Sequence, residues 1–297
     1  MPLLSTFGAA SATGFGQRRG SRAPYDIQFL VVAGGGAGNT YQAAGGGAGG
    51  FRTSTYSEVA VGTLLTISVG AGSNANGVRG ENSSIAGPGV STFTANGGGA
   101  GASSAAGQSG GSGGGGGGIG EGGGQTNPGG SGNLGGFTPA EGTNGGTGNG
   151  VPSERGCGGG GGASQAGGNG TGSSPGVAGG YGGAGAASTI TGPSVTYAGG
   201  GGGSAQYSFP GGPGGAGGGG NGGSGSGGNT STPGTDGLGG GGGAGSTGGG
   251  PRAGGSGVVI IRMPTASYSG TSTGAPEVLT SGTDTILRFT GDGSYTV

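Results

Sequence analysis

The stretches Gly113–Gly118 (GGGGGG) and Gly239–Gly243 (GGGGG) decide how this chain folds, because they are pure glycine and belong to no short repeat. Glycine supplies 101 of the 297 residues, yet it gathers in runs and does not recur at every third position. Collagen needs a strict Gly-x-y period and abundant proline, and this chain has only 14 prolines. Two readings remain, which are disorder, the compositional default, and an ordered non-collagen arrangement of glycine.

Ordered glycine needs a particular kind of stabilisation. Fixing each residue costs about 1–2 kcal/mol of backbone entropy, and glycine has no side chain that could bury apolar area in return. The backbone itself must then supply the contacts. We expect threefold polyglycine helices, extended by about 3.1 Å per residue, packed side by side with N–H groups bonded to neighbouring carbonyls. Because each such bond contributes only about 1 kcal/mol, the lattice should be anchored on a conventional framework.

Six segments rich in β-branched and aromatic residues supply that framework. Gly, Pro, Asn and Ser flank them, and no window has a helical hydrophobic period, so we predict strands and essentially no α-helix. The predicted fold class is all-β: a short-stranded β-sandwich of jelly-roll or tumour-necrosis-factor-like type with an inserted bundle of polyglycine helices. The segments are Tyr25–Ala33, Gly62–Val69, Ser83–Ala95, Ser188–Ala198, Gly257–Met263 and Asp284–Val297.

Composition along the chain predicts three parts. Residues 1–24 form an irregular N-terminal arm, residues 25–263 a glycine-rich domain that begins and ends on strands, and residues 264–297 a C-terminal β segment. Turn-forming clusters within the glycine regions predict repeated passes back and forth. Near the end of the chain, TGDGS at Thr290–Ser294 predicts a hairpin.

Charge and targeting signals exclude several classes of protein. Nine arginines, no lysine and ten acidic residues give a net charge of −1, which does not favour nucleic-acid binding. The single cysteine, Cys157, cannot form a disulfide within the chain. The chain has no run of 18 apolar residues, so we predict no membrane span. The N-terminus lacks the basic region of a secretory signal, and we therefore expect synthesis in a cytoplasm without export by the general pathway.

Catalytic, cofactor and metal sites are not expected. The chain has no histidine, which excludes a Ser-His-Asp triad, and no lysine, which excludes a phosphate-binding GxxxxGK[ST] loop. GxGxxG matches arise by chance in so much glycine. Glu141 and Glu154 form a conceivable glycosidase pair, but nothing in their spacing sets the two carboxylates at a catalytic distance, and a role in solubility is the better interpretation.

Aromatic residues are scarce and fall into two groups. Those inside predicted strands should be core residues: Phe29, Phe93, Phe289 and Tyr197. Those in glycine surroundings near turns either cover the edges of the bundle or project as candidate receptor contacts, since aromatic side chains dominate binding hot spots. The second group is Phe137, Tyr181, Tyr207 and Phe209.

An ordered set of segments carries a family resemblance over about Tyr25–Val297. The chain resembles the glycine-rich domains of tail-fibre and other virion proteins of bacteriophages. More distantly it is similar to the glycine-rich domain of anaplastic lymphoma kinase receptors, which implies a tumour-necrosis-factor-like sandwich with polyglycine helices, and to adhesins at the tips of T-even-like phage fibres. The segments are LVVAGGGAG (30–38), GGGAGGFRTS (45–54), GTLLTISVGAG (62–72), VTYAGGGGGS (195–204), GGSGVVIIRMP (254–264) and LRFTGDGSYTV (287–297).

We therefore expect a non-enzymatic structural component of a phage virion, a tail-fibre or surface-fibre subunit made in the host cytoplasm and located on the virion surface. Its arm would dock on other virion proteins, and unpaired strand edges favour a homotrimer. One alternative is an adhesin that binds a host receptor at a fibre tip, and a second is an extracellular matrix or filament protein. The candidate docking residues are Phe7, Phe15, Arg18, Arg19 and Arg22.

Overall fold

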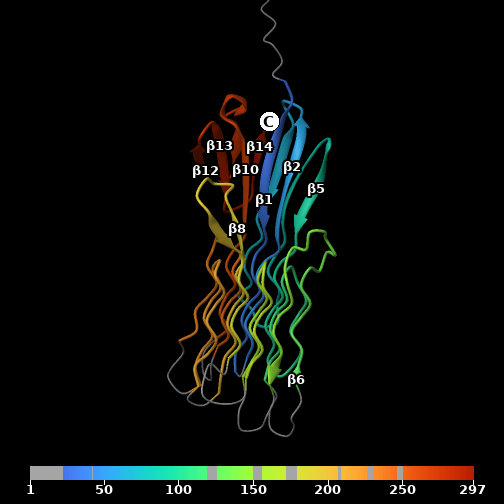
Figure 1. The fold of residues 1–297 in the computed structure, drawn as a ribbon. Helices are drawn as coiled ribbons and strands as arrows, with labels where there is room; N and C mark the ends of the chain where they lie inside the picture. Colours follow the sequence, from blue (N-terminus) through green and yellow to red (C-terminus); the bar gives the residue numbers. More distant parts are fainter. Residues whose placement is uncertain are drawn as a thin grey trace, which may run out of the picture.

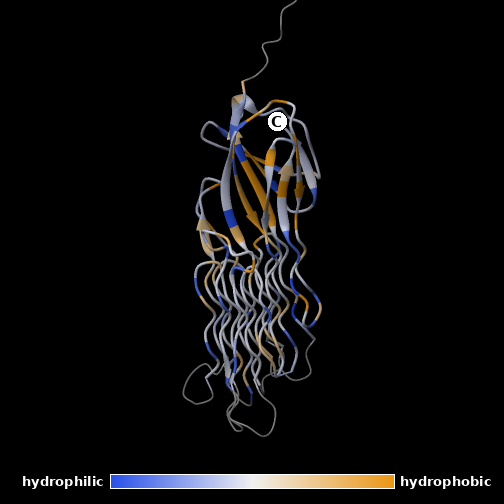
Figure 2. Cartoon of the chain, turned by 90° about the vertical axis from the view of Figure 1, so that its right-hand side faces the viewer, coloured by the Kyte–Doolittle hydropathy of each residue, from blue (hydrophilic) through white to orange (hydrophobic). Residues whose placement is uncertain are grey.

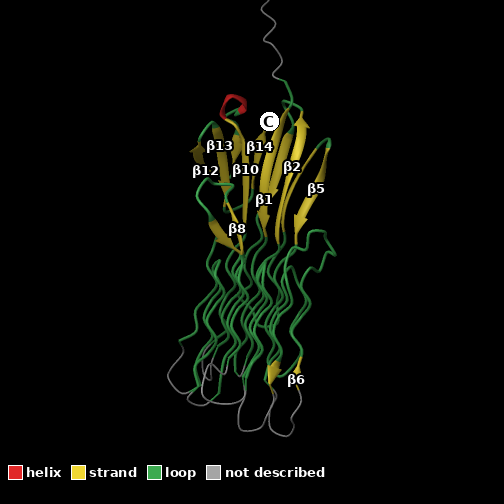
Figure 3. Cartoon of the chain, in the orientation of Figure 1, coloured by secondary structure: helices red, strands yellow, loops and turns green. Residues whose placement is uncertain are grey.

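The computed structural model describes residues 23–41, 43–118, 126–149, 156–171, 179–206, 209–225, 230–245 and 250–297. The molecule is elongated, with a β-sandwich at one end and a bundle of extended glycine segments at the other (Figure 1). Strands and loops make up almost all of the described chain, and one short 3₁₀ helix, Thr265–Ser267, is its only helical element (Figure 3). None of the described residues belongs to a helix with the length and hydrophobicity of a membrane span. The predicted all-β class is confirmed.

The first sheet contains the most apolar segments of the chain. Its central strands are β1 (Tyr25–Val32) and β10 (Val258–Pro264), which pair antiparallel with Phe29 opposite Ile261. Each of these strands is flanked on both sides by other strands of the sheet. Most residues on both of their faces are also buried, which suits their Ile- and Val-rich sequences. The sheet order is β12-β13-β10-β1-β2, completed by β12 (Glu277–Ser281), β13 (Asp284–Phe289) and β2 (Phe51–Val59).

The second sheet packs against the first to form the sandwich core. Its order is β11-β14-β3-β4-β5, and all its pairs are antiparallel. Leu65, Ile67, Ile85 and Tyr295 project from it into the core, where they join residues of β1, β10 and β13. Figure 2 shows the hydrophobic residues concentrated in the strands and the bundle nearly neutral in hydropathy. The strands are β11 (Ser272–Thr273), β14 (Gly293–Thr296), β3 (Leu64–Ser68), β4 (Ser83–Gly87) and β5 (Val90–Ala95).

Two expectations about strands need correction. The predicted hairpin around Thr290–Ser294 is wrong, because β13 and β14 belong to different sheets and the segment crosses the sandwich. Asp292 fixes this crossing, since its carboxylate accepts a hydrogen bond from the Val69 amide of the second sheet (2.8 Å). Strand β2 was not predicted, because its FRTSTYSEV sequence is polar and lies at a sheet edge. Residues 264–297 contribute strands to both sheets.

The outer face of the first sheet is half covered. A hairpin of β8 (Ala186–Ser188) and β9 (Val195–Tyr197) packs there with glycine segments. A second core forms beneath it, in which Tyr197 is only 2% exposed. The residues buried in this core include Leu30, Val32, Val258, Ile260 and Ile286. Of the aromatic residues expected in the core, Phe29, Phe289 and Tyr197 are buried and Phe93 is partly buried.

Hydrogen bonds along residues 45–50 define the bundle as a lattice of threefold helices. Residues three apart donate to the same neighbour: Gly45 and Ala48 to Gly158 and Gly161, and Gly46 and Gly49 to Gly242 and Gly239. The third set of amides, Gly47 and Gly50, donates to Gly99 and Asn96. The carbonyl groups of this segment accept hydrogen bonds from three further neighbouring segments. The donors are the amides of Gly115 and Ser112 in the first, of Gly36 and Ala33 in the second, and of Gly201 in the third. The period of three and the six neighbours identify polyglycine II packing.

At these glycine positions the lattice leaves no room for a side chain. A Cβ atom on Gly113, Gly114, Gly115 or Gly116 would lie between 1.9 and 2.2 Å from a carbonyl oxygen of a neighbouring segment. Real Cβ atoms do not come within 3.0 Å of another heavy atom. The long glycine runs are therefore required by packing, as the sequence predicted.

Candidate functional site at the two ends of the bundle

The far end of the bundle, opposite the sandwich, is marked by the short pair β6 (Thr126–Asn127) and β7 (Gly148–Asn149) (Figure 1). Hydrogen bonds connect this strand pair to neighbouring segments at the same end of the bundle. The Asn149 amide donates to the Gly156 carbonyl, Gly156 forms a β-bridge with Ala205, and the Ala205 amide donates to the Gly223 carbonyl. Strand β1 begins at the opposite end of the molecule. The start of β1 and the β6–β7 pair are thus separated by the length of the fold.

Two of the candidate receptor contacts lie toward the far end. Phe209 is half-buried, and its carbonyl accepts from Gly225, two residues beyond Gly223. Tyr181 lies about one helical turn closer to the sandwich. Its carbonyl accepts from Gly168, whose carbonyl accepts from Gly159, and Gly159 is three residues, or one threefold turn, beyond Gly156. The Tyr181 ring covers Gly168 and is 48% exposed. Tyr181 therefore covers an edge of the bundle while staying half-exposed, and its use as a receptor contact stays a prediction.

Phe137 lies elsewhere, at the junction between the bundle and the sandwich. The guanidinium carbon of Arg52 is 3.6 Å from the centre of the Phe137 ring and 4.0 Å from the centre of the Phe93 ring. Arg52 also donates to the Thr94 carbonyl (2.5 Å). A cation held between two rings in this way ties the 131–141 loop to strands of both sheets. Phe137 is thus half-buried in a packing role, and its use as a receptor contact stays a prediction.

The buried Glu141 completes this junction. Its carboxylate accepts from the Asn96 amide (2.9 Å) and the Asn96 side chain (2.7 Å), and its backbone carbonyl accepts from Phe51. Burial lowers the pKa of Arg52, and the negative charge of Glu141 opposes that shift. Glu141 is fully enclosed, which contradicts the expectation that it serves solubility: its role is to bond the junction. Sequence reasoning missed Arg52 and Asn96, because neither stands in a local motif.

Cys157 belongs to a second buried polar group near the far end. Its sulfur accepts from the Gly118 amide (3.2 Å), and the Ser204 hydroxyl lies 3.7 Å from it. The same hydroxyl accepts from the Ala43 amide and donates to the Ala43 carbonyl (2.9 and 2.8 Å). The thiol is buried, and its contact with the Gly118 amide gives it a packing role.

The fold does not bring the predicted contact residues together into one patch. Phe137 is at the junction, whereas Tyr181 and Phe209 are toward the far end. Across the described ranges no three His, Cys, Asp or Glu side chains form a possible metal-binding group. The remaining candidates lie outside the described residues, and so does the second carboxylate of the conceivable glycosidase pair. These are Phe7, Phe15, Arg18, Arg19, Arg22 and Tyr207, and Glu154.

Comparison with known proteins agrees with this architecture at the level of family. No curated protein and no solved structure gives a significant match to the chain. A family model described as a glycine-rich domain matches residues 18–264, which covers most of the 297-residue sequence and nearly all of the bundle. The chain therefore belongs to the glycine-rich domain family.

Proposed function

We propose that this protein is a non-enzymatic structural subunit of a bacteriophage virion, of the tail-fibre or surface-fibre type, in which the glycine bundle is a stiff mount. The observation that carries the proposal is the separation between the start of β1 at one end and the β6–β7 level at the other. A subunit of this shape can dock by its arm while presenting the far end to the surroundings. The ordered resemblance to phage glycine-rich domains supplies the biological context.

The hydrogen-bond lattice supports the stiffness that such a role needs. A segment of eight residues such as 43–50 spans about 25 Å, and residues 45–50 bond to six neighbours along it. Bending one segment would break bonds to several others at once. A flexible linker of similar composition would hold no fixed distance between its ends.

Virions provide the direct test of this proposal. Mass spectrometry of purified particles of the phage that encodes the chain should detect it in stoichiometric amount, and labelling with an antibody should place it on the particle surface. Absence of the protein from washed particles would defeat the proposal. Light scattering of the recombinant chain tests the proposed homotrimer separately, because a stable monomer at micromolar concentration contradicts only the oligomeric state.

The second candidate function is that of an adhesin for a host surface receptor, and the exposed ring of Tyr181 favours it. Aromatic side chains that already lie against a rigid backbone lose little entropy on binding. Soluble protein should then block adsorption of the phage to its host. A purely structural subunit would leave adsorption unchanged while still being present in the particle.

A further inference from the structure

A polar groove lies on the open half of the outer face of the first sheet, beside the β8–β9 hairpin. One recess of 300 Å³ is lined by Gln28, Thr53, Thr55, Ser188, Thr189 and Arg262, among others. A second recess of 150 Å³ continues it, because Gln28 and Arg262 line both, and adds Asp26, Pro264 and Asp284. This groove is on the sandwich and is separate from the far end of the bundle.

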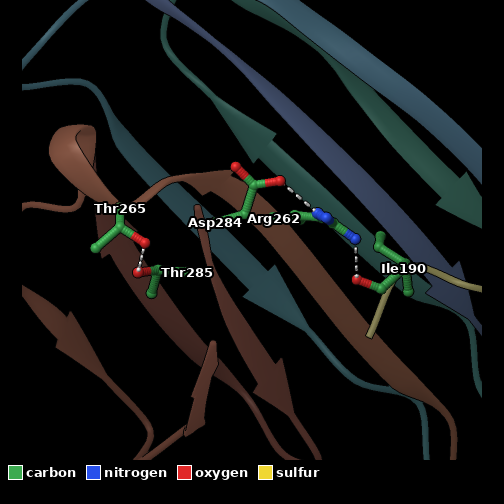
Figure 4. A network of polar contacts seen from close by, with 5 residues as sticks. All are labelled: Ile190, Arg262, Thr265, Asp284 and Thr285. Atoms are coloured by element: carbon green, nitrogen blue, oxygen red, sulfur yellow. Dashed lines mark hydrogen bonds and ion pairs between the residues drawn. The ribbon is translucent and has the colours of Figure 1, made fainter. Parts of the chain in front are cut away.

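Arg262 and Asp284 form a fixed charged pair at the floor of the groove (Figure 4). The Nε atom of Arg262 donates to Oδ2 of Asp284 (2.8 Å), and Nη1 donates to the Ile190 carbonyl of the hairpin (3.3 Å). The two side chains keep 23% and 28% exposure. The guanidinium is therefore held from two sides while part of it still faces the groove, so little entropy would be lost when it binds a ligand.

The polar side chains around the pair have hydrogen-bonding capacity to spare. Gln28 and Thr55 lie opposite each other in the pairing of β1 and β2, and both are exposed. Within the described part of the chain, the side chains of Gln28, Thr53 and Thr55 make no hydrogen bond to the protein. Amide and hydroxyl groups both donate and accept, so this wall of the groove can satisfy a ligand that does both.

The surroundings of Arg262 argue against other classes of ligand. Two carboxylates, Asp26 and Asp284, outnumber the single guanidinium, which disfavours a phosphate or another anion. A bare cation would be repelled by Arg262, and the oxygen atoms here are too few for a calcium site. Strands β1, β10 and β13 are paired on both sides, so the floor has no free backbone for an extended peptide to pair with.

We infer that this groove binds a neutral saccharide. A guanidinium beside a carboxylate presents a donor next to an acceptor, which matches two neighbouring hydroxyl groups of a sugar ring, one accepting from Arg262 and one donating to Asp284. The hydroxyl and amide groups of Thr55, Gln28 and Thr189 bond the remaining hydroxyls, and Ile190 and Pro264 offer apolar surface to the ring. The inference does not depend on the virion assignment.

A panel of immobilised oligosaccharides tests the site on the full-length chain. The neutral probes are maltotriose, cellotriose, mannobiose and N,N′-diacetylchitobiose, and the anionic probes are 3′-sialyllactose and a sulfated heparin disaccharide. At least one neutral probe should bind. Arg262→Gln and Asp284→Asn should each weaken that binding by about tenfold, because each removes a charged partner of a hydroxyl group.

A second variant keeps the test decisive if the charged pair proves necessary for folding. Gln28→Ala combined with Thr55→Ala removes two exposed side chains that make no hydrogen bond to any described residue, and binding should still fall by about tenfold. Thr92→Ala, at an exposed position of β5 in the second sheet, is the matched control and should bind like the parent. The inference is overturned if no neutral probe binds at millimolar concentration, if only the anionic probes bind, or if the double variant binds like the parent.

Discussion

The carbonyl oxygen of Gly158 lies 2.2 Å from the position that a Cβ atom on Gly115 would occupy. The two glycines belong to neighbouring segments that also both bond to Gly45, since Gly115 donates to the Gly45 carbonyl and the Gly45 amide donates to Gly158. A methyl group at position 115 would therefore push apart segments that several hydrogen bonds hold together. The stability of the bundle depends on glycine at such positions because of space, and not because of backbone conformation.

Substitution of Gly115 by alanine should lower the free energy of unfolding by about 3 kcal/mol or more, through overpacking and broken backbone bonds. The matched control is Gly291→Ala, because a Cβ atom there meets nothing within 4 Å. Thermal unfolding of the parent and the two variants measures the difference. Equal melting temperatures for all three proteins would show that the run around Gly115 is not packed.

Two buried serines should respond in opposite directions to the same substitution. Ser112 is fully buried, and its hydroxyl has no hydrogen-bond partner among the described residues, so Ser112→Ala should raise the free energy of unfolding by about 1 kcal/mol. The Ser204 hydroxyl bonds both backbone groups of Ala43, so Ser204→Ala should lower that free energy by about 1–3 kcal/mol. Denaturant titration of both variants checks the pair. A loss of stability in Ser112→Ala would indicate a partner for that hydroxyl.

The fold class was predictable from the sequence, because glycine in long runs can be ordered in few ways and the Ile- and Val-rich strands stand out from it. Which glycine segments lie next to each other in the lattice was not predictable. One glycine run looks like another, so nothing local indicates that Gly46 bonds to Gly242 and Gly201. Strand β2 was missed because its outward side is polar, and the stacking of Arg52 between Phe93 and Phe137 joins residues from three distant segments.

Replacing Phe137 or Tyr181 by alanine should have different effects on stability and on receptor binding. Phe137→Ala removes one face of the Arg52 stack and should lower the free energy of unfolding by about 2 kcal/mol. Tyr181→Ala removes a half-exposed ring from the side of the bundle and should leave the melting temperature nearly unchanged. If the adhesin function holds, only Tyr181→Ala should weaken the ability of soluble protein to block phage adsorption. The opposite pattern, with Phe137→Ala stable but inactive, would assign receptor contact to Phe137.

Alkaline pH should destabilise the sandwich through Tyr56. Burial raises the pKa of Tyr56 from 10.0 to about 12, and its hydroxyl lies 2.6 Å from the Ser91 carbonyl and 3.1 Å from the Ile85 carbonyl. In the unfolded chain this phenol loses its proton near pH 10, whereas in the folded protein it keeps the proton until about pH 12. The stabilisation is therefore complete below pH 10 and is lost as pH rises to about 12, at up to about 1.4 kcal/mol per pH unit.

Replacing Tyr56 by phenylalanine isolates this effect from the other tyrosines, including Tyr197, whose pKa burial also raises. At neutral pH Tyr56→Phe should be less stable than the parent, because the Ser91 and Ile85 carbonyls lose their donor. Between pH 10 and pH 12 the parent should lose stability faster than the variant, so the difference between them should shrink. Urea unfolding of both proteins across that range provides the measurement. A difference that stays constant with pH would mean that the Tyr56 phenol ionises equally in the folded and unfolded states.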